Sequence, residues 1–251
     1  MSATTVTTKT ETAAQRRLRG EAAKARHRLY PATAFYTTYA TALLWLGLRS
    51  TERLLAMSCF SGGMAAWTVL EYVVHRYVLH GRFPEGRGPV RWFTHKYFDP
   101  LHWEHHARPW DGEHINGRIR DTLPFAALFA AVASLAPLET APMFVAGLLQ
   151  AYVIEEWVHH SVHFYHFRNP YFRYIRRHHL YHHSPKGSEV GYGLTSGFWD
   201  VIWGTRIPEA DRRALYSYRK AALRRLRPPV IFIEQGGAAA HPLEPPLATR
   251  E

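Results

Sequence analysis

The sequence predicts an all-α integral membrane protein, in which a four-helix transmembrane bundle carries a cytosolic, histidine-rich helical cap. Three observations predict this fold: four uncharged apolar segments, basic residues concentrated on alternate connections, and histidines spaced as on helices. Hydrophobic residues make up 47% of the 251 residues, which is too many for a disordered chain. The length suits one sizeable domain.

Composition divides the chain into three parts. Residues 1–30 are predicted to be a flexible basic tail, because they are polar, contain seven Lys or Arg and lack the apolar core of a signal peptide. Residues 31–225 are predicted to be the membrane-embedded domain, with Pro31 at its start. Residues 226–251, rich in Gly, Ala and Pro, are predicted to be a flexible C-terminal tail.

The four uncharged segments form two predicted helical hairpins, 32–48 with 54–70 and 123–138 with 141–154. The second pair is joined by a tight connection between Pro137 and Pro142. Each segment is at or below the length that crosses a hydrocarbon core of about 30 Å, and Thr, Ser and Gly dilute the first two. Core helices of a soluble protein therefore remain an alternative.

The net charge of +11 is compatible with an anionic membrane surface or with nucleic acid. Seven Lys or Arg precede the first segment, two lie in 49–53, seven lie in 81–122, fourteen follow from residue 164, and none lies in 138–142. The positive-inside rule then places both termini and the middle segment in the cytoplasm. A nucleic-acid partner is not expected, since its binding would concentrate these charges on one patch. The single cysteine, Cys59, excludes a scaffold of intrachain disulfides.

Fifteen of the seventeen histidines lie between His75 and His183. Twelve of them form four sets, at 75 and 80, 102–106, 159–163 and 178–183. Spacings of three and four residues direct side chains to one helical face, so the last three sets can each converge. His75 and His80 are five residues apart, or about 140° on an ideal helix. We therefore expect this pair to serve different metals or to bracket a helix end near Gly81.

So many buried neutral imidazoles are costly unless a metal binds them. One zinc ion takes three or four ligands, whereas two octahedral ions accept eight to ten nitrogens, so the sequence predicts two metal ions. Imidazole alone does not specify the element, because zinc, copper, nickel and iron all accept it. Glu104 and Glu156 lie among the histidines and are candidates to orient imidazoles through their second N–H.

These residues resemble the fatty acid hydroxylase and sterol desaturase superfamily, whose members carry a histidine pair with a four-residue gap, two His-x-x-His-His boxes and an intervening histidine pair. The resemblance covers about Glu71 to Thr205 and is greatest to the fatty acid 2-hydroxylases. The segments that carry it are 71–80, 159–163, 179–183, 189–193, 195–200 and 204–205. Asp200 lies in one of these segments, where it is assigned no chemistry beyond a possible cap for the last helix.

The resemblance implies two iron ions that activate dioxygen, with zinc an expected substitute in isolated protein. Residues 31–225 would then form the catalytic domain. The family spacing selects His159 rather than His160, and His179 rather than His178. The implied metal ligands are His75, His80, His102, His105, His106, His159, His163, His179, His182 and His183.

The implied activity is that of a di-iron monooxygenase, an oxidoreductase that hydroxylates a C–H bond of a fatty acyl lipid. Eukaryotic fatty acid 2-hydroxylases often carry a fused cytochrome b5-like domain, for which the residues before the first box leave no room. We therefore expect a separate electron donor, either a cytochrome b5-like protein, a ferredoxin or a reductase. Alternatives are a desaturase or a carotenoid or sterol hydroxylase with the same boxes, a non-catalytic membrane metal-binding protein, and a zinc hydrolase.

Overall fold

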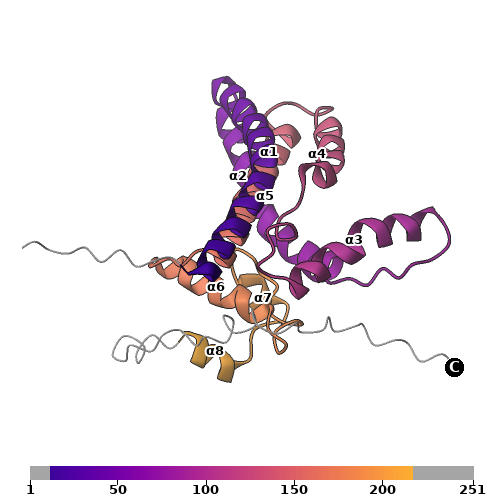
Figure 1. Ribbon diagram of the computed structural model, residues 1–251. Helices are drawn as coiled ribbons and strands as arrows, with labels where there is room; N and C mark the ends of the chain where they lie inside the picture. Colours follow the sequence, from indigo (N-terminus) through magenta and orange to yellow (C-terminus); the bar gives the residue numbers. More distant parts are fainter. Residues whose placement is uncertain (1–11, 217–251) are drawn as a thin grey trace, which may run out of the picture. The chain divides into compact units, whose positions relative to one another are not determined.

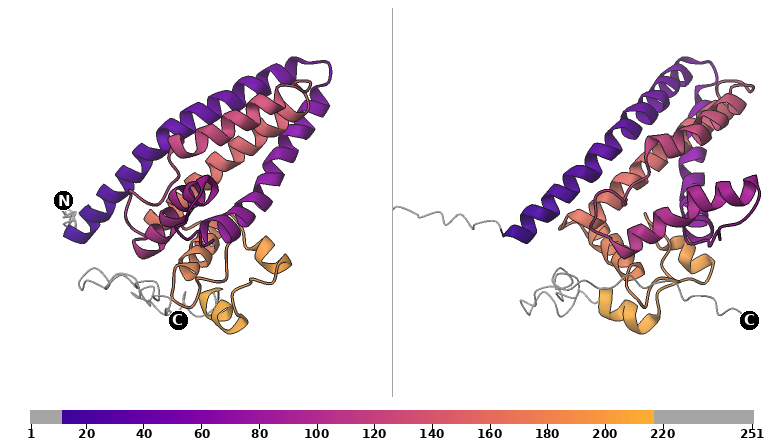
Figure 2. Two further views of the ribbon diagram at one scale, coloured as in Figure 1. Left: turned by 90° about the vertical axis from the view of Figure 1, so that its right-hand side faces the viewer. Right: turned by 45° about the vertical axis from the view of Figure 1, so that its right-hand side comes forward.

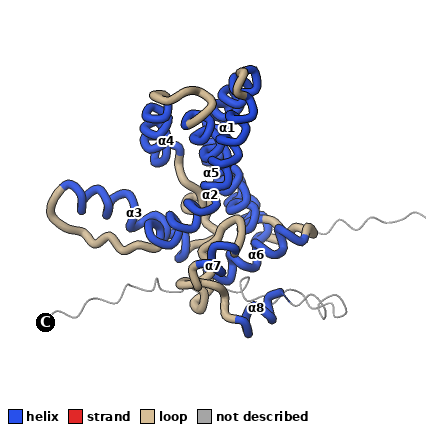
Figure 3. Tube along the Cα trace, turned by 180° about the vertical axis from the view of Figure 1, so that it is seen from behind, coloured by secondary structure: helices blue, strands red, loops and turns tan. Residues whose placement is uncertain are grey.

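The computed structural model describes residues 12–216, apart from the side chains of residues 97–101. This part of the chain is helical and contains no β-strand, which confirms the all-α prediction (Figures 1 and 3). The α-helices are α1 (Ala13–Arg49), α2 (Arg53–Val73), α3 (Pro89–Ala107), α4 (Ile119–Ala133), α5 (Ala141–Phe164), α6 (Pro170–His182), α7 (Phe198–Ile202) and α8 (Glu209–Tyr216). A π-helical segment, η1 (Val74–Leu79), continues α2.

The described part of the chain divides into two units, one that ends at Arg206 and one that begins at Ile207. Helices α1 to α7 and every histidine of the four sets belong to the first unit. Helix α8 is the described helix of the second unit, and it has no buried residues. The predicted C-terminal tail, 226–251, lies outside the described residues.

Helix α1 begins far earlier than the sequence analysis expects. Thr12 caps it, accepting from the backbone N–H of Gln15 while the Gln15 side chain accepts from the N–H of Thr12. The prediction of a flexible tail is wrong for residues 13–30, because Ala22, Ala25 and Leu29 form a buried stripe at helical spacing. Pro31 lies inside α1 and does not mark its start.

Helices α1, α2, α4 and α5 lie lengthwise beside one another, with α5 buried along most of its length (Figure 2). Helices α2 and α5 are parallel and approach closely at two glycines. A Cβ on Gly63 would lie 1.9 Å from the carbonyl oxygen of Phe144, and one on Gly147 would lie 1.9 Å from that of Phe60. Both helices therefore reach the histidine-rich end side by side.

One continuous helix in the described chain, Arg53–Leu79, is long and apolar enough by composition to cross a membrane. Helix α4 ends at Ala133, five residues before the end of the apolar segment 123–138 from which it was predicted. Large apolar side chains of the bundle are nonetheless exposed, among them Phe35, Trp45, Leu54, Leu128 and Phe129. The four predicted spans remain a prediction, whereas a wide apolar surface on the bundle is a finding.

Candidate metal centre

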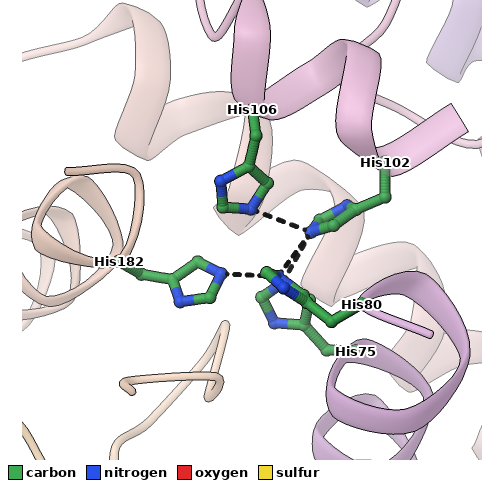
Figure 4. Close-up of side chains that lie close together, drawn as sticks. All are labelled: His75, His80, His102, His106 and His182. Carbon is green, nitrogen blue, oxygen red and sulfur yellow. Dashed lines mark hydrogen bonds between the residues drawn. The ribbon is translucent and has the colours of Figure 1, made fainter. Parts of the chain in front are cut away.

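Five imidazoles converge where η1, α3 and α6 meet (Figure 4). We call them the first cluster: His75, His80, His102, His106 and His182. The Nε2 atom of His102 lies 3.0 Å from that of His75 and 3.0 Å from that of His80. His106 Nε2 lies 3.1 Å from His102 Nε2, and His182 Nε2 lies 2.9 Å from His80 Nε2. Histidines about a hundred positions apart in the sequence thus direct their Nε2 atoms into one volume.

The helix end at Leu79 lies between His75 and His80, as one of the two expectations had it, but the other expectation, that they serve different metals, is not supported because both belong to this same cluster. The reason is the π-helical turn of η1, in which the N–H of His80 donates to the carbonyl of His75 at 3.0 Å. A hydrogen bond from i+5 to i closes a wider turn than that of an α-helix, which brings residues five apart onto one face. Their ring centroids are 5.0 Å apart.

Five more imidazoles form the second cluster, beside the first: His105, His159, His163, His179 and His183. Contacts again run through Nε2, at 3.1 Å between His105 and His159, 3.2 Å between His163 and His159, and 2.8 Å between His163 and His179. His183 Nε2 lies 3.0 Å from His179 Nε2. The structure thus brings together all ten histidines that the sequence singles out, in two groups of five.

Helices α3 and α6 each supply both clusters. On α3, His102 and His106 face the first cluster and His105 the second. On α6, His182 faces the first cluster, while His179 and His183 face the second. The rings of His106 and His183 stack across the boundary with centroids 4.2 Å apart, so the two clusters are immediate neighbours.

The donor set fits one metal ion in each cluster. The Nδ1–H groups of His75 and His182 donate to backbone carbonyls, which leaves a lone pair on each Nε2. Lone pairs that face one another repel unless a cation lies between them. Two nitrogens about 2.1 Å from one ion and about 90° apart are separated by about 3.0 Å, close to the 2.8–3.2 Å spacings of both clusters. The prediction of a dinuclear site is thereby supported, while the element remains a prediction.

Burial keeps these imidazoles in the neutral form that binds metals. Burial and the neighbouring His182 lower the pKa of His80 to about 3. Burial, His182 and His80 lower the pKa of His106 to about 2. Burial lowers the pKa of His182 to about 4, against the carbonyl of Val190, which raises it. At neutral pH the ligand atoms therefore need not lose a proton before a cation binds.

The two clusters differ in what holds the far side of the rings. In the first cluster, His75 Nδ1–H donates to the carbonyl of Tyr192, and His182 Nδ1–H donates to that of Val190 at 2.8 Å. In the second cluster, four Nδ1 atoms are buried and have no hydrogen-bond partner among the described residues: those of His105, His163, His179 and His183. Outer hydrogen bonds fix ring orientation, so His75 and His182 of the first cluster have an orienting contact that these four rings lack.

Neither predicted carboxylate orients an imidazole. Glu104 forms an exposed ion pair with Arg108. Glu156 is buried, but it accepts from the side chain of Asn116 at 2.7 Å and from the N–H of Gly117 at 3.2 Å. It therefore fastens the connection that leads into α4. The orienting acceptors are backbone carbonyls, which no residue type in a sequence reveals.

Histidines outside the family spacing lie outside both clusters. His160 is fully buried among the rings of Trp157, Phe164 and Tyr165. His178 contacts Asp200 at 3.1 Å. The choices of His159 over His160 and of His179 over His178 thus agree with which rings converge, although metal binding by them stays a prediction.

Two buried carboxylates near the clusters were missed as functional residues, although both lie in the segments that carry the family resemblance. Glu71 accepts from the N–H of Thr195 at 3.0 Å and from its hydroxyl at 2.7 Å. Asp200 is inside α7, with none of its surface exposed. Both carboxylates accept hydrogen bonds from the segment between α6 and α7. Their distance in sequence from the histidines does not predict this role.

Known proteins are similar to this chain over part of its length. A dihydroceramide fatty acyl 2-hydroxylase of Arabidopsis thaliana is 31% identical over 144 residues, 57% of this chain and 58% of its own length. The ceramide very long chain fatty acid hydroxylase of Saccharomyces cerevisiae is 32% identical, over 66% of this chain and 42% of its own length. The chain thus spans about half the length of these curated relatives.

A solved structure of full-length scs7p, in which only the hydroxylase domain is visible, matches with a TM-score of 0.58 and 27% identity. The match covers 72% of this chain and 67% of that one. A model of the fatty acid hydroxylase family matches residues 60–205, a range that includes both histidine clusters. Because this family model spans more than half of the 251 residues, the chain belongs to the fatty acid hydroxylase family.

Proposed function

We propose that this protein is a membrane-embedded oxidoreductase that hydroxylates a C–H bond of a lipid acyl chain at a histidine-ligated dinuclear centre. The observation that carries the proposal is the pair of adjacent five-histidine clusters at one end of an apolar helical bundle. Among the described residues, both groups of converging donors consist of imidazoles alone, unlike the mixed histidine and carboxylate ligands of the usual hydrolytic zinc site.

The ten clustered histidines would hold the metal ions, which we propose to be iron. When bound, such a pair supplies the reduction of dioxygen with two external electrons, the insertion of one oxygen atom into a C–H bond and the release of water. The protein keeps the imidazoles neutral and converging, and it buries most of them away from bulk water. The family names of the relatives support hydroxylation over desaturation.

An acyl substrate suits the surroundings of the site. The exposed apolar side chains of α1, α2 and α4 fit the hydrocarbon of a bilayer, and α2 and α5 run from there to the histidines. The named relatives act on ceramide or dihydroceramide fatty acyl groups, so we propose an acyl group of a ceramide-like lipid. A separate protein donates the electrons in this proposal.

The proposed topology has four membrane-spanning helices, with both termini and the histidine clusters on the cytoplasmic side. The distribution of Lys and Arg supports it, since 138–142 contains none. Cysteines introduced one at a time at Ser50, Glu139 and Lys186 test it. A membrane-impermeant thiol reagent added outside sealed cells should label the cysteines at positions 50 and 139 and should not label the one at position 186. Labelling of Lys186→Cys alone would indicate the opposite topology.

The activity is tested by expressing the full chain in a host and profiling its lipids by mass spectrometry. We expect new acyl species heavier by one oxygen atom, which disappear in the His105→Ala variant. The position of the oxygen is read by fragmentation. Oxygenated species that persist in the variant, or unsaturated species in their place, would refute the proposed reaction.

A further inference from the structure

The segment between α6 and α7 holds the outer side of the first cluster. The carbonyl of Val190 accepts from Nδ1–H of His182, and the carbonyl of Tyr192 accepts from Nδ1–H of His75. These two histidines come from different helices, α6 and η1, yet the same short loop orients both. Whatever fixes the loop therefore fixes the direction in which two of the five Nε2 atoms point.

Asp200 fixes this loop. Its carboxylate accepts the N–H of Tyr192 at 2.8 Å and the N–H of Gly193 at 3.0 Å. It also accepts the hydroxyl of Thr205 at 2.8 Å, and it contacts Nε2 of His178 at 3.1 Å. Burial raises the pKa of Asp200, but hydrogen bonds from these groups outweigh burial, so the pKa lies below its usual value. The group is thus a buried carboxylate with four partners.

The network extends from Asp200 to the helix that carries His75. Arg76 donates to the hydroxyl of Tyr72 at 2.9 Å, and that hydroxyl lies 2.7 Å from the hydroxyl of Thr205. Because Thr205 donates to Asp200, its oxygen is an acceptor for Tyr72. The loop and the α2–η1 helix are thereby fastened to the same carboxylate.

We propose that Asp200 is a positioning residue for the first cluster alone: it fixes the 190–193 loop whose carbonyls orient His75 and His182. The inference rests on the proposed function in that both clusters bind metal. The second cluster provides the contrast, since four of its Nδ1 atoms have no partner among the described residues and none contacts this loop. Asp200 does not touch an imidazole of either cluster, and it acts through the loop.

The change Asp200→Asn tests this with little change in shape. An amide nitrogen donates where the carboxylate accepts, so it opposes one of the donors that face it. We expect metal bound in the first cluster to be held about 10- to 100-fold more weakly. One of the two loop hydrogen bonds, from the N–H of Tyr192 or from that of Gly193, would be lost without removal of any proposed ligand.

Two single-cluster backgrounds separate the clusters. The His163→Ala variant disables the second cluster and His80→Ala disables the first. Zinc affinity of the full-length detergent-solubilised protein is measured by competition with a chelator in each background, with and without Asp200→Asn. We expect the loss of affinity in the His163→Ala background and no change in the His80→Ala background.

Asp121→Asn is the matched control, because that carboxylate pairs with Arg118 and Arg120 on α4. It should leave zinc affinity unchanged in both backgrounds. Thr205→Val removes one donor to Asp200 and serves if Asp200→Asn does not fold, as judged by helical circular dichroism. It should weaken the first cluster in the same direction but less.

Equal weakening of both clusters, or no weakening of the first by either variant, would overturn the inference. Failure of the unsubstituted protein to bind two zinc ions would instead contradict the proposed dinuclear site. The two failures are therefore distinguishable, because the first is read from variants and the second from the parent protein.

Discussion

The N–H of His80 donates to the carbonyl of His75, and this single π-turn places both imidazoles in the first cluster. A regular α-helix would point them about 140° apart. A π-turn interrupts helical hydrogen bonding and commonly marks functional sites. Here it allows one short segment to supply two of five converging nitrogens.

Because the pair shares a cluster, we expect the double variant His75→Ala/His80→Ala to lose one metal ion of two. The variant His80→Ala/His163→Ala, with one change in each cluster, should disable both. Metal content after reconstitution and dialysis, measured by mass spectrometry of the elements, checks this. Loss of both ions from the first variant would mean that the two histidines serve different metals.

Close approach of α2 and α5 should make Gly147→Ala destabilising, since its Cβ would lie 1.9 Å from the carbonyl oxygen of Phe60. We expect a loss of about 1–3 kcal/mol in the free energy of unfolding, as for overpacking elsewhere. Gly62→Ala is the control on the same helices, because its nearest contact is the Phe144 ring at 3.8 Å. That change should be neutral or slightly stabilising, given the helix propensity of alanine. Thermal unfolding in detergent compares the two.

Glu104 lies between proposed ligands in the sequence but pairs with Arg108 on the surface. We expect Glu104→Gln to leave metal content unchanged and to alter the free energy of unfolding by about 0.5 kcal/mol or less, as for other exposed ion pairs. Metal analysis and denaturant titration are the measurements. A loss of metal would instead show that Glu104 orients an imidazole, as its sequence position suggests.

Acidification should destabilise the metal-free protein in a defined range. The folded-state pKa is lowered to about 3 for His80, about 2 for His106 and about 4 for His182. Since the unfolded chain takes up these protons near pH 6.5 and the folded chain does not, stability is retained above about pH 6.5 and falls as the pH is lowered toward those values.

Denaturant titrations of the metal-free protein between pH 8 and pH 5 measure this loss. His80→Ala should reduce the pH slope, by up to about 1.4 kcal/mol per pH unit for the one histidine removed. Gly62→Ala, which removes no titratable group, should leave the slope unchanged. A slope unaffected by His80→Ala would show that this histidine is protonated equally in both states.

Periodicity was sufficient to predict helices and convergence within the last three histidine sets, because His-x-x-His-His spacing acts within a few turns of one helix, whereas the full set of ten followed from the family resemblance. It was insufficient at η1, where an ideal helical repeat misplaces His80 relative to His75. Residues 13–30 were mistaken for a tail, because their many charges obscure the buried stripe through Ala22 and Ala25.

Features that depend on tertiary contacts had no local signal. The orienting groups are carbonyls of Val190 and Tyr192, and every residue has a carbonyl. Asp200 was identified only as part of a motif, because its partners lie in three separate segments of the chain. Such roles follow from the fold and not from the spacing of residues.

His105 and His106 are neighbours in sequence, yet they belong to different clusters, as do His182 and His183. Consecutive residues on a helix are rotated by about 100°, at a rise of about 1.5 Å. The helical rise and rotation of α3 and α6 therefore determine which histidine faces which cluster. An inserted or deleted residue within either His-x-x-His-His box would rotate the histidines that follow it by about 100° and turn them away from their cluster.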